Sequence, residues 1–254
     1  MIAKLFSRRA KIVPSAGHIP DGRRIYAIGD IHGRFDLLEG LLQRIAEDEA
    51  DRGGPRGELI FLGDLVDRGP DSAKVVERLI ALRQERSDTR FLLGNHEEVF
   101  LSALEGSVKG MRFFHRIGGM ETILSYGITP KDYAAADFEE LSQMLQAAVP
   151  DSHRQFLASF EDMIVEGDYV FVHAGIRPDV ALADQVPRDL RWIREDFLRH
   201  DGAFERIVVH GHTISSDVVQ LPHRIGLDTG AYHSGKLSAI GLEGGESWIV
   251  QEQG

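Results

Sequence analysis

Residues 25–45 read IYAIGDIHGRFDLLEGLLQRI, and this stretch contains the signals of a strand, a loop and a helix in that order. Residues 25–28 form a short apolar run that ends at Gly29, whereas residues 35–48 place leucines and isoleucines on one helical face. The two patterns predict a buried strand followed by an amphipathic helix. Asp30 and His32 lie in the loop between them.

The same pattern occurs twice more along the chain. LIFLGDLVDRG at residues 59–69 precedes a helical stretch, and RFLLGNHE at residues 90–97 leads into another. Asp64 follows Asp30 by 34 residues, and Asn95 follows Asp64 by 31 residues, close to the roughly thirty residues of one β-α-β unit. We therefore expect the three loops to meet at one edge of a sheet, where ligands of α/β proteins bind.

The rest of the chain changes character twice. Residues 105–165 contain no comparable strand and predict a helical insertion, with Asp137 and Asp151 as possible helix caps. Strands return afterwards, and the last three are hairpin-like, which indicates a second, more antiparallel sheet packed on the first; the predicted strands are residues 169–172, 207–209, 224–227, 237–240 and 247–250. We predict one α/β domain over residues 23–254, preceded by an irregular N-terminal lead-in at residues 1–22.

Composition excludes several classes of function. The chain contains no cysteine, which rules out disulfides, thiolate metal sites and cysteine nucleophiles. Its formal net charge of −11 argues against broad binding to nucleic acid or to an anionic membrane. The opening segment carries charge too early for a signal peptide, so we expect a cytoplasmic protein. A phosphate substrate would need local positive charge from metal ions and a few arginines.

Five predicted strands end in side chains that bind metal ions. The runs are GDIHG at 29–33, GDLVDRG at 63–69, GNHE at 94–97, HAG at 173–175 and HGHT at 210–213. Side chains two apart on an extended chain point the same way, so Asp30 and His32 can bind one ion together. A single aspartate after a strand is usually a helix cap, but capping does not explain five such ends. Imidazole with carboxylate and amide oxygens suits Mn, Fe or Zn better than Mg.

The ordered set GDIHG, GDLVDRG, GNHE, HAG and GHT closely resembles the phosphoprotein phosphatase family of calcineurin-like metallophosphoesterases, over about residues 25–240. The resemblance implies a calcineurin-like β-sandwich of two mixed sheets flanked by helices. It also implies two divalent metal ions, with Mn²⁺ the first choice and Fe or Zn as alternatives. By the same resemblance Asp30 and His32 hold the first ion, Asp64 bridges both, and the second ion is held by Asn95, His173 and His212.

The resemblance also assigns residues to the reaction. His96 is the general acid or electrostatic partner at the leaving oxygen, Asp67 orients it, and Arg68 binds the substrate phosphate together with Asn95. A second phosphate-binding arginine is expected in the run LRWIRE at residues 190–195, where we prefer Arg194 over Arg191.

The nucleophile implied is a hydroxide shared by the two metal ions, which attacks in line without a covalent phosphoenzyme. We interpret His210 and Asp228 as residues that support the site without binding metal.

Two substrates remain open within this family. Symmetric diadenosine tetraphosphate hydrolases resemble the same motifs but typically differ at the position of Asp67 and carry Asp after GNH. Asp67 and Glu97 are of the protein-phosphatase type, which favours hydrolysis of phosphomonoesters by a serine/threonine protein phosphatase; the alternative is a symmetric bis(5'-nucleosyl)-tetraphosphatase. A catalytically inactive binding module is disfavoured, because it would not need His96 and Arg68. The expected partner is a phosphorylated protein or a small phosphate ester, and the oligomeric state is left open.

Overall fold

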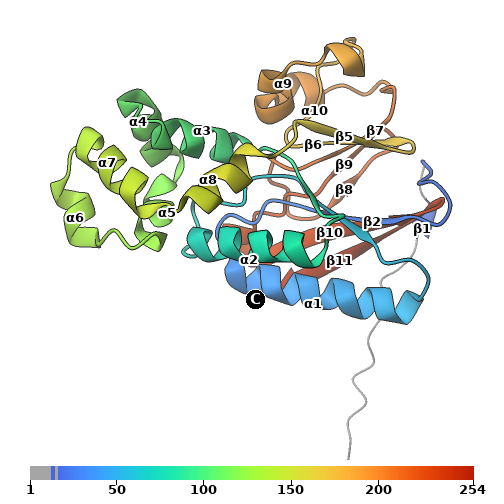
Figure 1. Cartoon of the computed structure of the whole chain (residues 1–254). Helices are drawn as coiled ribbons and strands as arrows, with labels where there is room; N and C mark the ends of the chain where they lie inside the picture. The colour runs from blue at the N-terminus through green and yellow to red at the C-terminus, as the bar shows by residue number, and fades with distance from the viewer. Residues whose placement is uncertain (1–12, 15–16) are drawn as a thin grey trace, which may run out of the picture.

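Two mixed sheets form the centre of the computed structural model, which describes residues 13–14 and 17–254 (Figure 1). Residues 1–12 and 15–16 of the predicted lead-in lie outside the described residues. The first sheet has the order β1-β11-β10-β2-β3-β4, with strands Val13–Pro14, Glu246–Gln253, Lys236–Glu243, Arg24–Ile28, Glu58–Phe61 and Arg90–Phe91. The second has the order β5-β6-β7-β9-β8, with strands Met163–Glu166, Tyr169–Val172, Ile207–His210, Arg224–Gly226 and Val219–Gln220.

Successive side chains of a strand point to opposite faces of its sheet, and this alternation produces four layers: helices, the first sheet, the second sheet and helices again. In β2, Tyr26 and Ile28 belong to the core that contains α1 (Phe35–Arg52) and α2 (Ser72–Glu85). Ile25 belongs to the core between the two sheets, where it shares a cluster with residues of β6, β7 and β9. The outer face of the second sheet packs under α9 (Pro187–Trp192) and α10 (Glu195–Leu198). Both sheets are thus covered on both faces, which explains their continuous apolar strands.

The three predicted strand-loop-helix units are confirmed. β2 pairs with β3, and β3 with β4, in parallel. The helices that follow these strands are α1, α2 and α3 (Asn95–Leu104). The third strand is shorter than expected, because only Arg90 and Phe91 join the ladder. The loops after all three strands therefore lie at the same edge of the first sheet.

The assignment of the last hairpin to the second sheet was wrong. β10 and β11 belong to the first sheet, where Ala239 pairs with Ile28 and Ile240 with Ala27 in antiparallel register. Only β9 among the last three predicted strands joins the second sheet, between β7 and β8. Six of the eight residues of β10, 237–242, are buried, so both its faces are apolar and its sequence pattern fits either sheet.

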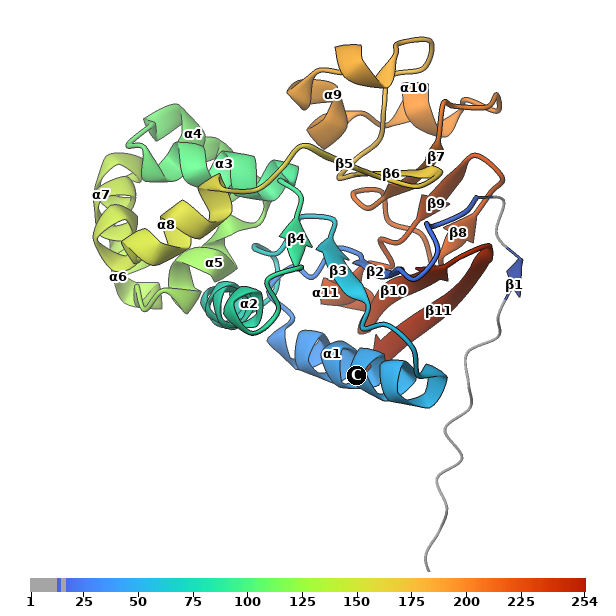
Figure 2. The same cartoon turned by 45° about the vertical axis from the view of Figure 1, so that its right-hand side comes forward.

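A helical lobe lies beside the β4 edge of the first sheet (Figures 1 and 2). It consists of α3 and the insertion helices α4 (Val108–Ile117), α5 (Gly119–Ser125), α6 (Pro130–Ala135), α7 (Phe138–Ala148) and α8 (Asp151–Ala158).

One of the two helix caps predicted in the lobe is confirmed, and the structure departs from the prediction at Asp151 and at β5. Asp137 caps α7 by accepting from the amides of residues 139 and 140, as predicted, at 2.8 and 2.9 Å. Asp151, in contrast, is the first residue of α8 and makes no cap, since Pro150 precedes the helix. β5 also begins at Met163, inside the stretch for which no strand was expected. Within the described residues, no helix has the length and apolar character needed to span a bilayer.

Candidate active site and metal centre

Unusual backbone geometry marks the loops at the sheet edge. Among the described residues six non-glycine residues have positive φ, and five of them are predicted site residues: His32 (47°), Asp64 (51°), Asp67 (74°), Arg68 (69°) and His212 (63°). Left-handed conformations cost energy in residues with a Cβ and persist where the surrounding structure enforces them, often at functional sites. The strain is thus concentrated where the sequence predicted chemistry.

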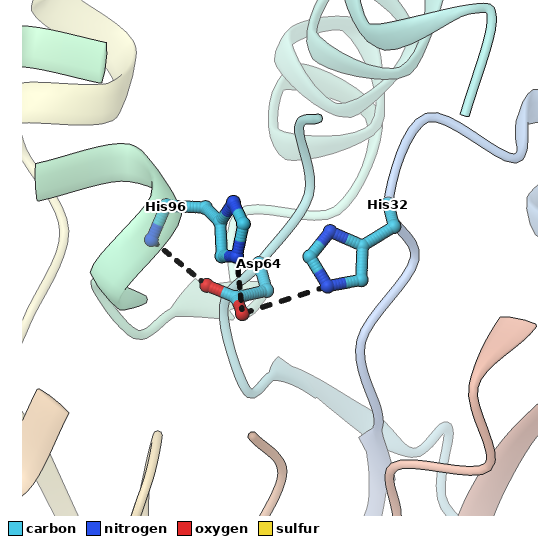
Figure 3. A group of neighbouring side chains, drawn as sticks. All are labelled: His32, Asp64 and His96. Atoms are coloured by element: carbon cyan, nitrogen blue, oxygen red, sulfur yellow. Dashed lines mark hydrogen bonds and ion pairs between the residues drawn. The ribbon is translucent and has the colours of Figure 1, made fainter. Parts of the chain in front are cut away.

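Asp64 is the point on which the histidines converge. Its carboxylate lies 3.6 Å from His32 Nε2, 3.8 Å from His96 Nε2 and 3.3 Å from His173 Nε2. Figure 3 shows His32 approaching the carboxylate from a loop and His96 approaching it from the first turn of α3. Two groups of three side chains therefore share Asp64, each with its ligand atoms within 4.8 Å: His32, Asp64 and His96, and Asp64, His173 and His212.

Hydrogen bonds determine which ring nitrogens can bind a cation. His32 Nδ1 lies 2.8 Å from the carbonyl oxygen of Val66, and His173 Nδ1 lies 2.7 Å from that of Leu62. A carbonyl only accepts, so both Nδ1 atoms carry a proton, and in the neutral rings both Nε2 atoms are left with a lone pair. His173 Nε2 then faces Asn95 Oδ1 at 3.0 Å. Two acceptors at this distance need a proton or a metal ion between them.

His212 provides a further lone pair. Its Nε2 is buried and has no hydrogen-bond partner within the described structure. Burial, followed by repulsion from His173, lowers the pKa of His212 to about 2. A neutral, buried imidazole with an unpartnered nitrogen suits a metal ion.

The buried carboxylates concentrate negative charge here. Burial and the neighbouring carboxylates of Asp228 and Asp64 raise the pKa of Asp30. Asp30 receives the backbone amide of His212 on both oxygens, at 3.2 and 3.0 Å, and is absent from the two groups around Asp64. Asp228 Oδ2 is also buried without a partner among the described residues. The donor set of imidazole, carboxylate and amide oxygens fits divalent cations, which would neutralise this charge.

His96 is held by a chain of buried hydrogen bonds. Its Nδ1 donates to Asp67 Oδ2 at 2.6 Å, and Thr122 Oγ1 of α5 donates to Asp67 Oδ1 at 2.7 Å. Burial alone would lower the pKa of His96, but the carboxylates of Asp64 and Asp67 outweigh it and raise that pKa. The hydrogen bond to Asp67 leaves Nε2 facing the site, and the raised pKa favours the protonated ring, which is the form that can donate a proton from Nε2 to a leaving group.

Arg68 spans the two histidines. It donates to His32 Nε2 at 2.8 Å, and its other terminal nitrogen lies 2.9 Å from His96 Nε2. Its guanidinium also lies 4.9 Å from the ring centre of Tyr232, a residue of α11 (Ala231–Ser234) that the sequence did not single out. The guanidinium of Arg68 therefore lies at the centre of the site, where its two terminal nitrogens can bind two phosphate oxygens.

The two candidates for a second arginine have different surroundings. Arg191 is engaged, since it pairs with Glu98 at 3.1 Å and with Asp162 at 2.7 Å. Arg194 is exposed and has no ion pair or hydrogen bond from its side chain within the described residues, and its charge contributes to lowering the pKa of His212. These surroundings favour Arg194 as the arginine that is free to meet a substrate.

Two supporting residues were missed as such by the sequence reasoning. Glu97 is fully buried and accepts the backbone amides of Asp64, Leu65 and Gly94 at 2.8, 2.8 and 3.1 Å. Burial and Asp64 raise its pKa to about 7. Its place in GNHE could have pointed to this role. Thr122 had no comparable signal, because its partner Asp67 lies 55 residues earlier.

The two residues interpreted as supporting ones lie beside the site. His210 is buried, and its Nδ1 lies 3.0 Å from the carbonyl oxygen of Gly211. Burial lowers the pKa of His210 to about 4. Asp228 Oδ1 accepts the amide of Gly230 at 2.9 Å. Its other oxygen, Oδ2, is the buried atom without a partner, and its charge contributes to raising the pKa of Asp30.

Comparisons with known proteins agree with this geometry. Residues 23–236 match the family described as calcineurin-like phosphoesterase. The chain is 30% identical to the asymmetrical bis(5'-nucleosyl)-tetraphosphatase PrpE of Bacillus subtilis (strain 168), over 84% of this chain and 88% of that protein. It is 28% identical to the symmetrical bis(5'-nucleosyl)-tetraphosphatase of Janthinobacterium sp. (strain Marseille), over 85% and 92%. The cold-active protein-tyrosine phosphatase of a psychrophilic Shewanella sp. shares the fold, with a TM-score of 0.58 and 17% identity over 94% and 83% of the two chains.

Proposed function

The chain belongs to the calcineurin-like phosphoesterase family, and from this premise we propose that it hydrolyses a phosphoanhydride bond of a bis(5'-nucleosyl) tetraphosphate. The observation that carries hydrolysis is the buried carboxylate of Asp64, shared by two groups of metal-ligand side chains beside the His96–Asp67 pair. The names of relatives that match most of their own length support the nucleotide substrate. This reverses the order of the two substrates expected from the sequence.

Two divalent ions would be held by residues that the fold brings together. Asp30, His32 and Asp64 would hold the first ion, and Asp64, Asn95, His173 and His212 the second, with Mn²⁺ preferred over Fe or Zn. When bound, such a pair supplies an activated water and neutralises charge on the phosphate.

Phosphate binding and proton donation are assigned to side chains that act without a metal ion. Arg68 and Arg194 bind the oxygens of the phosphate under attack, assisted by the amide of Asn95, because a planar fork matches two oxygens at once. His96 gives its proton to the departing oxygen. Asp67 accepts from Nδ1 of His96 at 2.6 Å, which orients the ring and stabilises the protonated form that can donate from Nε2.

A serine/threonine protein phosphatase is the second candidate, and a specific observation favours it. A serine alkoxide is a poor leaving group and needs a proton in the transition state, whereas a nucleotide phosphate leaves as a stable anion. The fully buried Asp67 that orients His96 is the arrangement that an alkoxide would require. Glu97 is also of the protein-phosphatase type.

The test compares two substrates on the metal-loaded protein. We expect a bis(5'-nucleosyl) tetraphosphate to be hydrolysed with the higher kcat/KM, and a phosphoserine peptide with the lower. His96→Asn should lower kcat on the peptide by about 10²–10³-fold and on the tetraphosphate much less, since general acids contribute about 10²–10⁴-fold where the leaving group needs them. Faster hydrolysis of the peptide would overturn the nucleotide proposal, and metal-independent activity on both would overturn the metal centre.

A further inference from the structure

A hollow of about 610 Å³ lies along α4 in the helical lobe, and three cations line it. Lys109, Arg112 and Arg116 are all exposed, and the other lining residues, Ser102, Ser107, Gly110 and Phe113, include no carboxylate. We call Lys109, Arg112 and Arg116 the α4 cationic face. Such a concentration of positive charge is unexpected in a chain with a net charge of −11.

The three cations have no acidic partners. None of them makes an ion pair or a side-chain hydrogen bond with another described residue. The guanidinium of Arg112 lies 5.5 Å from the ring centre of Phe138, and that of Arg116 lies 4.7 Å from the ring centre of Phe113. No ion pair therefore neutralises these charges within the described structure; Arg112 also lines a second hollow that includes Asp137 and Glu139.

Helix geometry places the cations in one row. Residues three and four apart on a helix are neighbours, so Lys109, Arg112 and Arg116 share one side of α4. At 1.5 Å per residue the row is about 10 Å long. Like charges at this spacing repel each other and destabilise the helix slightly, a cost that an anion bound along the row would remove.

The row begins next to the candidate active site. Gly118, two residues after Arg116, accepts the backbone amide of Arg68 at 2.9 Å. Phe113 stacks on Trp192 with ring centres 5.8 Å apart, and the indole of Trp192 donates to Glu98 on α3, the helix that begins at Asn95. α3 and α4 are neighbours in the lobe (Figure 1). The α4 cationic face thus leads away from the phosphate-binding arginine.

We propose that the α4 cationic face binds the phosphates that lie beyond the scissile bond of a nucleoside polyphosphate. The inference rests on the proposed function and deepens it. A phosphomonoester places one phosphate at Arg68 and gains nothing from cations farther along. A chain of phosphates carries several charges in a line, and its outer phosphates would meet Arg116, then Arg112 and Lys109.

The test removes the three charges and compares ligands of different length. The face variant is Lys109→Gln/Arg112→Gln/Arg116→Gln. Its control is Arg56→Gln/Lys131→Gln/Arg188→Gln, which removes three exposed cations that make no ion pair with another described residue and changes the net charge equally. Both are assayed as metal-loaded protein on p-nitrophenyl phosphate, with inorganic tripolyphosphate or orthophosphate as inhibitor, and then on a bis(5'-nucleosyl) tetraphosphate.

We expect the face variant to keep its activity on p-nitrophenyl phosphate and its inhibition by orthophosphate, which also shows that it is folded. Inhibition by tripolyphosphate should weaken about tenfold, and KM for the tetraphosphate should rise by a similar factor, as three exposed charge contacts allow. The control should match the unmodified protein. Tripolyphosphate chelates metal equally in all three samples.

The outcomes separate the two proposals. Equal inhibition of face variant and control by tripolyphosphate would overturn the binding face, whatever the substrate is. Face-dependent inhibition by tripolyphosphate, without hydrolysis of the tetraphosphate by the unmodified protein, would overturn the proposed function and leave the face supported as a polyphosphate site.

Discussion

Replacing Thr122 by Val tests how far the helical lobe contributes to the reaction. The substitution keeps the shape of the side chain and removes its hydroxyl. That hydroxyl is fully buried, donates to Asp67 Oδ1 at 2.7 Å and accepts the amide of Asp67 at 2.8 Å. Thr122→Ser is the matched control, because it keeps the hydroxyl and loses only a methyl group.

The expected loss of stability follows from these two bonds and from the contact of the same hydroxyl with Ser72 Oγ at 2.9 Å. A hydrogen bond to a charged group contributes about 1.5–3 kcal/mol and a neutral one about 0.5–1.5 kcal/mol. The amide of Asp67 retains Ser72 Oγ at 3.0 Å, so the neutral bond is partly replaced. We expect Thr122→Val to lower the free energy of unfolding by about 2–4 kcal/mol, measured by urea denaturation, and Thr122→Ser to lower it by much less.

The effect on activity should depend on the leaving group. Asp67 still accepts from His96 in Thr122→Val but is held less firmly, so part of the general-acid contribution is lost. We expect about a tenfold lower kcat on a phosphoserine peptide and less than about threefold on p-nitrophenyl phosphate, whose leaving group needs little protonation.

In a His96→Asn background, Thr122→Val should lower kcat on the peptide by less than a further factor of about two, because both substitutions act through the same proton donor. Equal losses on both substrates, or a full additional loss without His96, would refute the reasoning.

Three further predictions concern the metal centre, the arginines and pH. Asp64→Asn should reduce the metal content measured by mass spectrometry and abolish the stabilisation that saturating metal provides, about 2.7 kcal/mol at a hundredfold excess over Kd; unchanged stoichiometry would contradict its shared position. Arg194→Ala should raise KM for every phosphate substrate about tenfold without changing stability, whereas Arg191→Ala, which breaks two ion pairs, should change stability more than KM; the reverse would assign the phosphate to Arg191. His210 has a folded pKa of about 4, below the ordinary value of about 6.5, so between these values the unfolded chain binds a proton that the folded chain does not. Stability of the metal-free protein should therefore fall as pH falls from 6.5 to 4, and His210→Asn should flatten that dependence in urea titrations.

Local patterns in the sequence were enough to predict much of this protein. The strand-loop-helix units at β2, β3 and β4 follow from periods of two and 3.6 residues, which neighbouring residues determine among themselves. Ligand-type side chains at the strand ends could be recognised for the same reason. Since parallel strands must place their carboxyl ends together, the convergence of Asp64 with His32 was also predictable.

Contacts between distant segments decided the rest. β10 is apolar on both faces, so pairing with β2, and not its own pattern, placed it in the first sheet. Thr122 became a partner of Asp67 only because α5 packs against a loop 55 residues earlier. The α4 cationic face acquired its relation to Arg68 through the contact at Gly118. Such contacts depend on how helices pack in three dimensions, and a single sequence carries no periodic signal for them.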